Sequence, residues 1–287
     1  MQFTNASAEF LVPDGKPERE ALERITHLGI GAHQDDLEFH AFHGILECFA
    51  TPDRWFGGVT CTDGAGSART GPYATCSDAR MVEIRREEQN EAARIGRYAA
   101  MIQLDYPSRI VKSPAETGLK RDLTKILTVV RPEVVYTHNL ADKHETHIGV
   151  AIAALEAMRE LPREHRPRKV IGFEAWRNLD WLPDPDKVLM NVEGNDELRT
   201  ALGQVFDSQI AGGKRYDLAI EGRSLTNATM LDSHTPDTAT RLIYGMDLTP
   251  LVLDESLDIV QYAGNFLDRF KNDVQDKLAR RLGHSTR

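Results

Sequence analysis

The sequence predicts an α/β domain, with a Rossmann-like, doubly wound, mostly parallel sheet flanked by helices. Short apolar runs alternate along the chain with longer amphipathic stretches, which is the order that a parallel sheet with crossover helices requires. The chain has 287 residues, of which 41% are hydrophobic and 28% are charged. It is therefore long enough to bury a sizeable core, and its composition excludes wholesale disorder.

The first strand, helix and strand are expected between residues 25 and 61. Residues 25–31 form a short apolar run that glycine closes, and residues 55–61 form a second apolar run. The stretch between them, over 38–49, has helical periodicity. We expect two parallel strands joined by a crossover helix.

Further helices and strands follow in the same alternation. The spacing of apolar residues predicts an amphipathic helix over 81–98, and Pro132 ends a second helix just before a strand. The helix over 148–161 is the most strongly predicted, because it is rich in Ala, Leu and Met. These expected elements are strands over 101–104, 133–137 and 170–173, and helices over 81–98, 119–130 and 148–161.

The domain organisation is simple. Residues 1–22 mix proline, glycine and charge, and we expect an N-terminal arm or loop there. Residues 23–287 are expected to form one domain, with a core over about 23–178 and an elaborated C-terminal third over 179–287. In that third the pattern loosens, and only helices over 196–209 and 255–282 stand out.

Charge and cysteine content narrow the function classes. The formal net charge is −9 at pH 7, which argues against a broad phosphate-binding face and so against a nucleic-acid partner. No apolar run approaches the roughly 18 residues of a membrane helix, and no signal peptide is evident, so we expect a cytoplasmic protein without a membrane span. The unpaired pattern of Cys48, Cys61 and Cys76 favours neither disulfides nor a four-cysteine zinc site.

The first chemical motif directly follows the first strand. His33 and Asp36 are three residues apart on a loop that enters a helix, and imidazole and carboxylate together suit a divalent metal such as zinc. Asp35 could then face the open coordination position and handle a proton. The alternative is that Asp35 or Asp36 only caps the helix. His40 and His43 are expected to be ordinary packed or surface residues.

The second motif lies more than a hundred residues later, between the strand over 133–137 and the strongest helix. The segment 138–147 contains His144 and His147, three residues apart at the helix entry. A ligand from this segment would complete a His/Asp/His set with an open fourth position, as a catalytic zinc requires. A surplus histidine could act as an acid or an electrostatic partner. The alternative is that these histidines only form hydrogen bonds within a loop.

Four segments together resemble the LmbE-like or PIG-L-type de-N-acetylases, zinc-dependent enzymes that remove acetyl groups from N-acetylglucosamine-containing substrates. That family has A-H-P-D-D-E after the first strand, T-D-G after the second, an R-x-x-E helix and a D-x-H-x-x-H segment. This chain has AHQDDL at 32–37, TDG at 62–64, RREE at 85–88 and DKHETH at 142–147. The order and spacing agree over roughly residues 25 to 160.

The resemblance implies a role for each matching residue of the reaction centre. His33, Asp36 and His147 would hold the metal. Asp35 would be the general base, and His144 would be protonated and stabilise the oxyanion.

Two further roles are implied around this centre. Arg85 would contact sugar hydroxyls, with a helix-surface salt bridge to Glu88 as the alternative. Asp142 would orient His144 or His147, and the alternative is a simple turn residue.

Five positions depart from the family pattern. Gln34 replaces proline and Leu37 replaces glutamate in the first motif. Thr146 and Ser108 stand where aspartates are usual, and Phe206 replaces a histidine before Ser208 and Gln209. The metal ligands and the base are retained, so the departures concern substrate recognition.

We therefore predict a metal-dependent hydrolase that removes an N-acetyl group from an N-acetylglucosamine-type sugar or sugar conjugate. The expected cofactor is Zn²⁺, although Fe²⁺, Mn²⁺ or Co²⁺ would also suit the ligands. The expected partners are the small-molecule substrate and, in a homo-oligomer, other copies of the chain. Alternatives are an amidase for another N-acyl or thiol-sugar conjugate, or an inactive carbohydrate-binding relative. A dinucleotide-binding enzyme is set aside, since no G-x-G-x-x-G follows the first strand.

Overall fold

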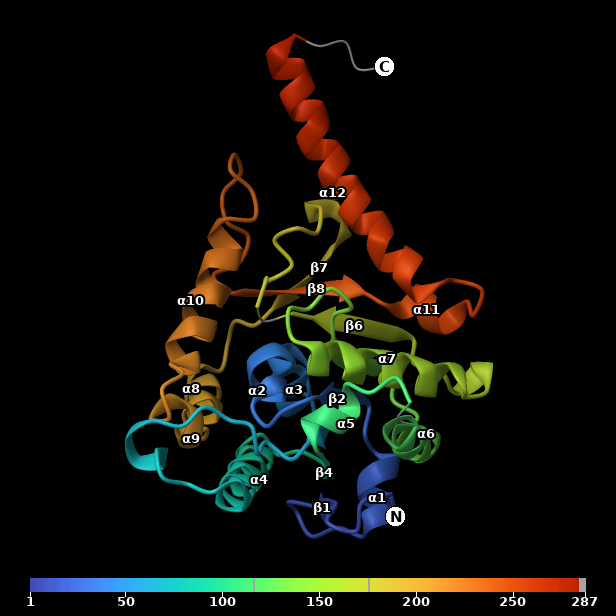
Figure 1. The fold of residues 1–287 in the computed structure, drawn as a ribbon, viewed down its shortest axis with the longest axis vertical. Helices are drawn as coiled ribbons and strands as arrows, with labels where there is room; N and C mark the ends of the chain where they lie inside the picture. Colours follow the sequence, from blue (N-terminus) through green and yellow to red (C-terminus); the bar gives the residue numbers. More distant parts are fainter. Residues whose placement is uncertain (116, 175, 284–287) are drawn as a thin grey trace.

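A computed structural model describes residues 1–115, 117–174 and 176–283 of the chain. It contains an eight-stranded sheet with helices on both faces (Figure 1), in the strand order β1-β4-β3-β2-β5-β6-β8-β7. The predicted α/β class with a mostly parallel sheet is confirmed.

The centre of the sheet is parallel. Its strands, in spatial order, are β4 (Ala100–Tyr106), β3 (Phe56–Thr62), β2 (His27–Gly31), β5 (Val134–His138) and β6 (Lys169–Phe173). The chain runs outward from β2 to β3 and β4, and then returns to the other side of β2 with β5. The order of strands therefore reverses between β2 and β5, and in such sheets ligands bind beyond the carboxyl ends of the strands at this reversal.

Antiparallel strands complete both edges. β1 (Glu9–Leu11) pairs with β4, while β8 (Leu242–Asp247) lies between β6 and β7 (Lys187–Asn191). The first 22 residues are thus more than the expected arm, because they add this edge strand and most of α1 (Glu18–Glu23). Strands β7 and β8 were not predicted, since they are short and pair across about fifty residues of sequence.

Two hydrophobic clusters lie on opposite faces of the sheet. The cluster on one face includes buried side chains of α1, α6 (Gly118–Val130), α7 (Glu145–Arg159) and α11 (Thr249–Leu253). The cluster on the other face includes side chains of α2, α3, α4 and α8. These four helices span Asp36–His40, Phe42–Ala50, Asp78–Ile95 and Asp196–Gln204. Burial on both faces holds the ends of the central strands in fixed positions.

Several helix boundaries differ from the sequence expectation. The helix expected over 38–49 is divided at Ala41 into α2 and α3. The helix expected over 148–161 begins earlier, at Glu145, which places His147 in its first turn. Similarly, the helix expected over 196–209 ends at Gln204, and α9 (Asp207–Ile210) follows separately.

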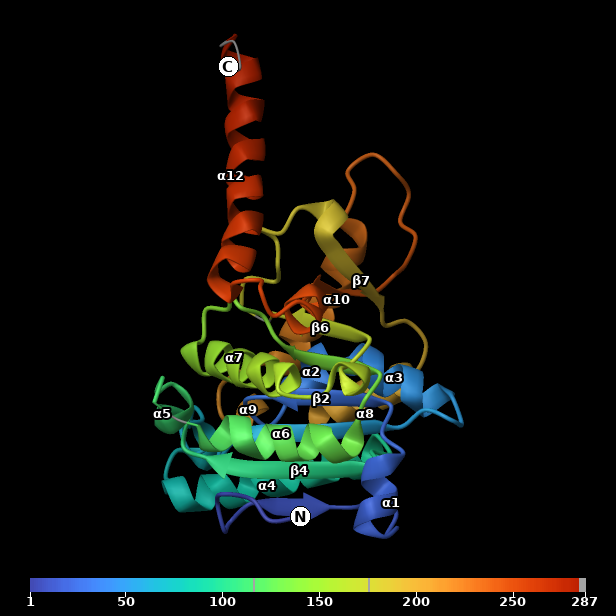
Figure 2. The same cartoon turned by 90° about the vertical axis from the view of Figure 1, so that its right-hand side faces the viewer.

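The remaining helices belong to connections and to the C-terminal third. They are α5 (Ser108–Val111), α10 (Tyr216–Thr229), α12 (Ile259–Leu282) and three 3-10 turns over Gly71–Tyr73, Arg163–His165 and Asp184–Asp186. Helix α12 projects from the body of the molecule (Figures 1 and 2), and none of its residues is buried. Within the described residues, no helix has the length and apolar character that crossing a bilayer requires.

Candidate active site

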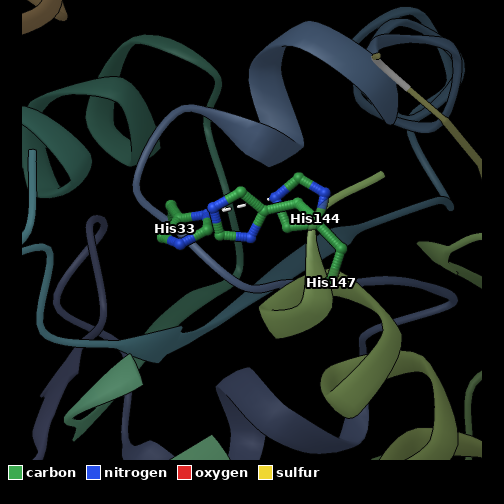
Figure 3. A group of neighbouring side chains, drawn as sticks. All are labelled: His33, His144 and His147. Atoms are coloured by element: carbon green, nitrogen blue, oxygen red, sulfur yellow. Dashed lines mark hydrogen bonds between the residues drawn. The ribbon is translucent and has the colours of Figure 1, made fainter. Parts of the chain in front are cut away.

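The two predicted motifs meet at the carboxyl ends of β2 and β5. His33 and Asp36 lie on the loop and first turn that follow β2, and His144 and His147 lie at the entry of α7. Figure 3 shows His33 facing His144 and His147 from the opposite loop. The parallel pairing of β2 with β5 brings these segments together, since adjacent parallel strands end at the same edge.

The side chains of the three predicted metal ligands lie close together. His33 Nδ1 lies 3.2 Å from His147 Nε2 and 3.4 Å from Asp36 Oδ2, and His147 Nε2 lies 3.7 Å from Asp36 Oδ1. A tetrahedral ion with bonds of about 2.1 Å holds its ligand atoms about 3.4 Å apart. The two histidines approach different oxygens of Asp36. Among the described residues, two groups have ligand atoms that all lie within 4.8 Å of one another, namely His33, His144 and His147, and Asp36, His138 and His147. His147 belongs to both groups, and these donor types suit a divalent cation.

His138 is a site residue to which the sequence analysis gave no role. It is the last residue of β5, its ring stacks on His147 at 3.9 Å, and its Nε2 lies 3.2 Å from Asp36 Oδ2. The same Nε2 accepts a hydrogen bond of 2.8 Å from the Ala32 amide, so its lone pair is already used. This favours His33 over His138 as the ligand beside Asp36 and His147. The available signal was its position at the end of a strand.

Asp142 supports both histidines at the α7 entry. Its Oδ2 accepts a hydrogen bond of 2.9 Å from His147 Nδ1, and its Oδ1 accepts one of 2.8 Å from the His144 backbone N–H. Burial by itself lowers the pKa of His147, but the charges of Asp36 and Asp142 outweigh it and raise the pKa. The bond to Nδ1 leaves Nε2 facing His33 and Asp36, as in the carboxylate–histidine pairs of metal sites. Asp142 is thus more than a turn residue.

Asp35 lies beside the ligand group in an unusual conformation. Its φ of 95° lies in the left-handed region, which costs a residue with a side chain about 1–3 kcal/mol. Although Asp35 stands at the N-cap position of α2, its side chain makes no capping hydrogen bond. Burial, together with the negative charge of Asp36, raises the pKa of Asp35 to about 6, while Arg85 opposes the shift. A carboxyl with this pKa can exchange a proton near neutral pH.

His144 lines the same cleft but carries no charge at neutral pH. Its pKa is lowered to about 4. Burial is the largest cause, and the neighbouring His147 and His33 contribute to the same decrease. Among the described residues, its buried Nδ1 has no hydrogen-bond partner. Burial, with a smaller contribution from the nearby histidines, therefore favours a neutral imidazole at His144 over the expected protonated form.

Arg85 is almost completely buried, with 1% of its surface exposed. Its guanidinium donates to Asp35 Oδ2 at 3.1 Å and to the Gln34 carbonyl, and it lies 3.4 Å from Glu88 Oε2. The ion pair with Glu88 is real but is not on the helix surface. Arg85 also lines the cleft described below, and its expected contact with sugar hydroxyls remains a prediction.

A cleft of about 600 Å³ opens above these residues. One side consists of the two motif segments and of Ser108 and Lys112, and the other comes from the C-terminal third. Trp176 is 40% exposed there, and its ring meets the Tyr216 ring edge-on at a centroid distance of 6.5 Å. The sequence analysis assigned no role to the residues of this second side, which are Trp176, Gln209, Lys214, Tyr216, Ala219, Ile220 and Arg223.

The departures from the family pattern are accommodated in different ways. Leu37 and Phe206 are fully buried in the cluster that covers one face of the sheet. Ser108 lines the cleft, as does Thr146, whose hydroxyl is buried without a described hydrogen-bond partner. His40, expected to be an ordinary packed residue, also lines the cleft, and burial lowers its pKa to about 4.

Comparison with known families supports the predicted resemblance. Residues 28–158 match the PIG-L family, described as GlcNAc-PI de-N-acetylase. The match includes all four motifs, so the resemblance is confirmed over this region. No curated protein matches the chain as a whole or in part.

Solved structures share the fold at low sequence identity. The N,N′-diacetylchitobiose deacetylase of Pyrococcus horikoshii is 17% identical with a TM-score of 0.61, and covers 84% of this chain and 90% of its own. The 4-carboxy-2-hydroxymuconate hydratase GalB of Pseudomonas putida is 19% identical with a TM-score of 0.61, covering 79% and 97%. A zinc-inhibited form of a teicoplanin deacetylase is 15% identical with a TM-score of 0.53, covering 77% and 97%. Deacetylases and a hydratase share this fold, so the fold alone does not select the reaction.

Proposed function

We propose that this chain, which carries the PIG-L family region over residues 28–158, is a metal-dependent de-N-acetylase of N-acetylglucosamine-type sugars or their conjugates. The observation that carries the proposal is the proximity of His33, Asp36 and His147, which approach one another to 3.2–3.7 Å in the cleft that Asp35 also lines. A structural metal site would not need an acidic side chain of shifted pKa next to its ligands.

In this proposal His33, Asp36 and His147 hold the cation, and Asp142 fixes the orientation of His147. When bound, a divalent cation supplies Lewis-acid chemistry, which lowers the pKa of water and polarises a carbonyl. Two imidazoles and one carboxylate suit Zn²⁺, and also Fe²⁺, Mn²⁺ or Co²⁺. Because one structural neighbour is described as zinc-inhibited, all four metals belong in the test.

Asp35 is the proposed general base. Its pKa of about 6 leaves it deprotonated at neutral pH, so it can take a proton from the water that attacks the amide carbonyl. The protonated carboxyl can then deliver that proton to the leaving amine. His144 faces the same space as a neutral imidazole and can donate a hydrogen bond to the developing oxyanion, which is a role that needs no positive charge.

The cleft supports a substrate larger than acetamide. Trp176 and Tyr216 offer aromatic surface for the apolar face of a sugar ring or its aglycone. The only acidic side chains among the described lining residues are the proposed base and one ligand, whereas Lys112, Lys214 and Arg223 add positive charge. A negatively charged group on the substrate is therefore favoured at the cleft.

The experiment that tests the proposal combines metal analysis with acetate release. The purified protein is loaded separately with Zn²⁺, Fe²⁺, Mn²⁺ and Co²⁺, and free acetate is measured with N-acetylglucosamine, its 6-phosphate, N,N′-diacetylchitobiose and an N-butyryl analogue. We expect one bound cation per chain and acetate release that Asp35→Ala lowers by about 10²- to 10⁴-fold. Release of butyrate in preference to acetate would instead identify an amidase for a larger acyl group. The absence of stoichiometric metal binding would overturn the metal-dependent mechanism.

A further inference from the structure

The conformation of Asp35 requires an explanation beyond its own residue type. Its backbone has φ 95° and ψ −28°, a combination that side-chain-bearing residues rarely adopt and that surrounding contacts must enforce. The carboxyl is placed beside the ligand group only because the backbone turns in this way. Whatever holds the backbone therefore also sets the position of the carboxyl.

Two side chains of α4 contact Asp35 from one side. The Asp35 backbone N–H donates to Gln89 Oε1 at 3.2 Å, and Arg85 donates to Asp35 Oδ2 at 3.1 Å. Arg85 also donates to the carbonyl of Gln34, the residue before Asp35. Arg85 and Gln89 are one helical turn apart, so they present their polar groups on the same face of α4. Together they bind the backbone on the N-terminal side of Asp35 and its side chain.

Each of these side chains is itself fixed. Gln89 Nε2 donates to Glu38 Oε1 at 2.8 Å, and the Tyr98 hydroxyl donates to the same oxygen at 2.6 Å. The Gln89 amide can therefore turn only its oxygen toward Asp35. On the other side, Glu88 pairs with Arg85 and accepts from the Ser208 backbone and hydroxyl at 2.7 and 2.6 Å. The contacts form a buried network that does not depend on substrate.

Gln34 completes this arrangement where the family pattern has proline. Its Nε2 donates to the Thr62 carbonyl at 3.1 Å and to Gln103 Oε1 at 3.3 Å. Gly64 has φ 72°, and a Cβ on it would lie 2.5 Å from Gln34 Oε1 and 3.2 Å from Arg85 Cβ. The glycine of the TDG segment is thus needed to leave room for these two side chains. Hydrogen bonds from Gln34 restrain the loop that a proline ring would otherwise restrain.

We propose that Arg85 and Gln89 of α4, with Gln34 of the loop, act as a clamp that holds Asp35 in its left-handed conformation, and that Arg85 is a positioning residue for the base. The inference rests on the proposed function in that Asp35 is taken as the general base. It differs from the role that the family resemblance implies for Arg85, which is contact with sugar hydroxyls. The burial of Arg85 and its bonds to Gln34 and Asp35 favour positioning.

The main test separates kcat from KM. Gln89→Leu removes the acceptor for the Asp35 N–H at similar volume. Arg85→Lys removes the guanidinium nitrogen that donates to both Gln34 and Asp35. Because a small misplacement of a catalytic group can cost about 100-fold, we expect kcat to fall by about 10- to 100-fold with KM within about twofold. Metal content should stay that of the wild type. The control is Glu91→Gln, an exposed residue of the same helix, which should leave both constants unchanged.

A charge-swap rescue distinguishes positioning from general packing. Gln89→Glu alone places two carboxylates side by side, whereas Gln89→Glu combined with Glu38→Gln restores one donor and one acceptor at that contact. We expect the double variant to recover at least about tenfold in kcat over Gln89→Glu. No recovery, or a rise in KM alone in Arg85→Lys, would overturn the clamp and favour substrate contact.

A structural readout keeps the inference separate from the proposed function. In crystal structures, Asp35 should have positive φ in the wild type and should leave that region in Gln89→Leu. If the wild type releases no acetate, the proposed function fails, but the φ angle of Asp35 in the wild type and in Gln89→Leu still tests the clamp.

A second pair of variants is used if Gln89→Leu does not fold. These are Gln34→Pro and Gln34→Ala, and the proline variant should keep a kcat at least about fivefold higher than that of the alanine variant. Positive φ retained in Gln89→Leu, or equal kcat in the two Gln34 variants, contradicts the proposal.

Discussion

The two sides of the cleft are built differently. The catalytic floor, which we define as residues 33–36 and 138–147, comes from loops at the ends of central parallel strands, and most of its charged side chains are buried and hydrogen-bonded. The recognition wall, which we define as Trp176 and residues 209–223, comes from the C-terminal third and presents an exposed aromatic ring and cations. The difference indicates that chemistry requires fixed atoms, whereas recognition can use surface that adapts to the substrate.

If this comparison is right, the largest effect should follow removal of a floor ligand. His147→Ala deletes an imidazole that lies 3.2 Å from His33 Nδ1 and 3.7 Å from Asp36 Oδ1. We expect the variant to lose stoichiometric metal and to show no acetate release above background, because two remaining ligands bind a divalent ion weakly. Metal analysis after gel filtration measures this. His234→Ala, on an exposed segment, is the matched control, and retention of metal in His147→Ala would contradict the ligand assignment.

The next largest effect should separate the base from the ligands within the floor. Asp35→Ala is expected to keep its metal and to lower kcat by about 10²- to 10⁴-fold, the usual contribution of a proton-transfer group. Metal content and kcat are measured on the same preparation. Wild-type turnover in this variant would remove Asp35 from the mechanism, and loss of metal would make it a ligand instead.

The raised pKa of Asp35 predicts how kcat depends on pH. Because burial raises its pKa to about 6, the carboxyl is protonated and inactive as a base below that pH. We expect kcat to be level above pH 7 and to fall about tenfold per pH unit below pH 6. The rate is measured from pH 4.5 to 8.5, with the metal content determined at each pH. A variant that lacks the Asp35 carboxyl but retains measurable activity is the control. If its rate falls at low pH in the same way, that fall belongs to another group.

The smallest effect should come from the wall. Trp176→Ala removes an exposed ring that lines the cleft. We expect KM to rise by about tenfold, equivalent to about 1.4 kcal/mol of binding, with kcat within about threefold. Steady-state kinetics test this, with Val260→Ala on the exposed face of α12 as the control. A fall in kcat with unchanged KM would show that the wall takes part in chemistry, and would remove the distinction between the two sides.

Much of the floor was predictable because each motif follows a strand. The apolar runs before His33 and before His138 predict strands, and parallel strands end at the same edge of the sheet. The sequence therefore predicted that His33, Asp36 and His147 lie close together at this edge. The sequence also predicted that Asp142 orients His144 or His147, because it lies five residues before His147 at the start of the helix.

Other features could not be predicted from local pattern. Arg85 stands in a highly charged stretch that predicts a solvated helix face, yet its side chain is buried under the loop of Asp35. The C-terminal strands β7 and β8 lack a clear alternation and pair across a long connection. The lowered pKa of His144 depends on its burial and on the histidines around it, and residue spacing reveals neither.

The sequence by itself determined the parallel core and the candidate reacting groups, because strand periodicity and short-range motifs are local properties of the chain. Only the tertiary structure decided that side chains of α4 contact Asp35, that His138 bonds to the backbone of Ala32, and that Trp176 lines the same cleft as the floor. These contacts join residues far apart in sequence. They form because burial forces each polar group to find a partner, and that partner is chosen by packing rather than by neighbouring residues.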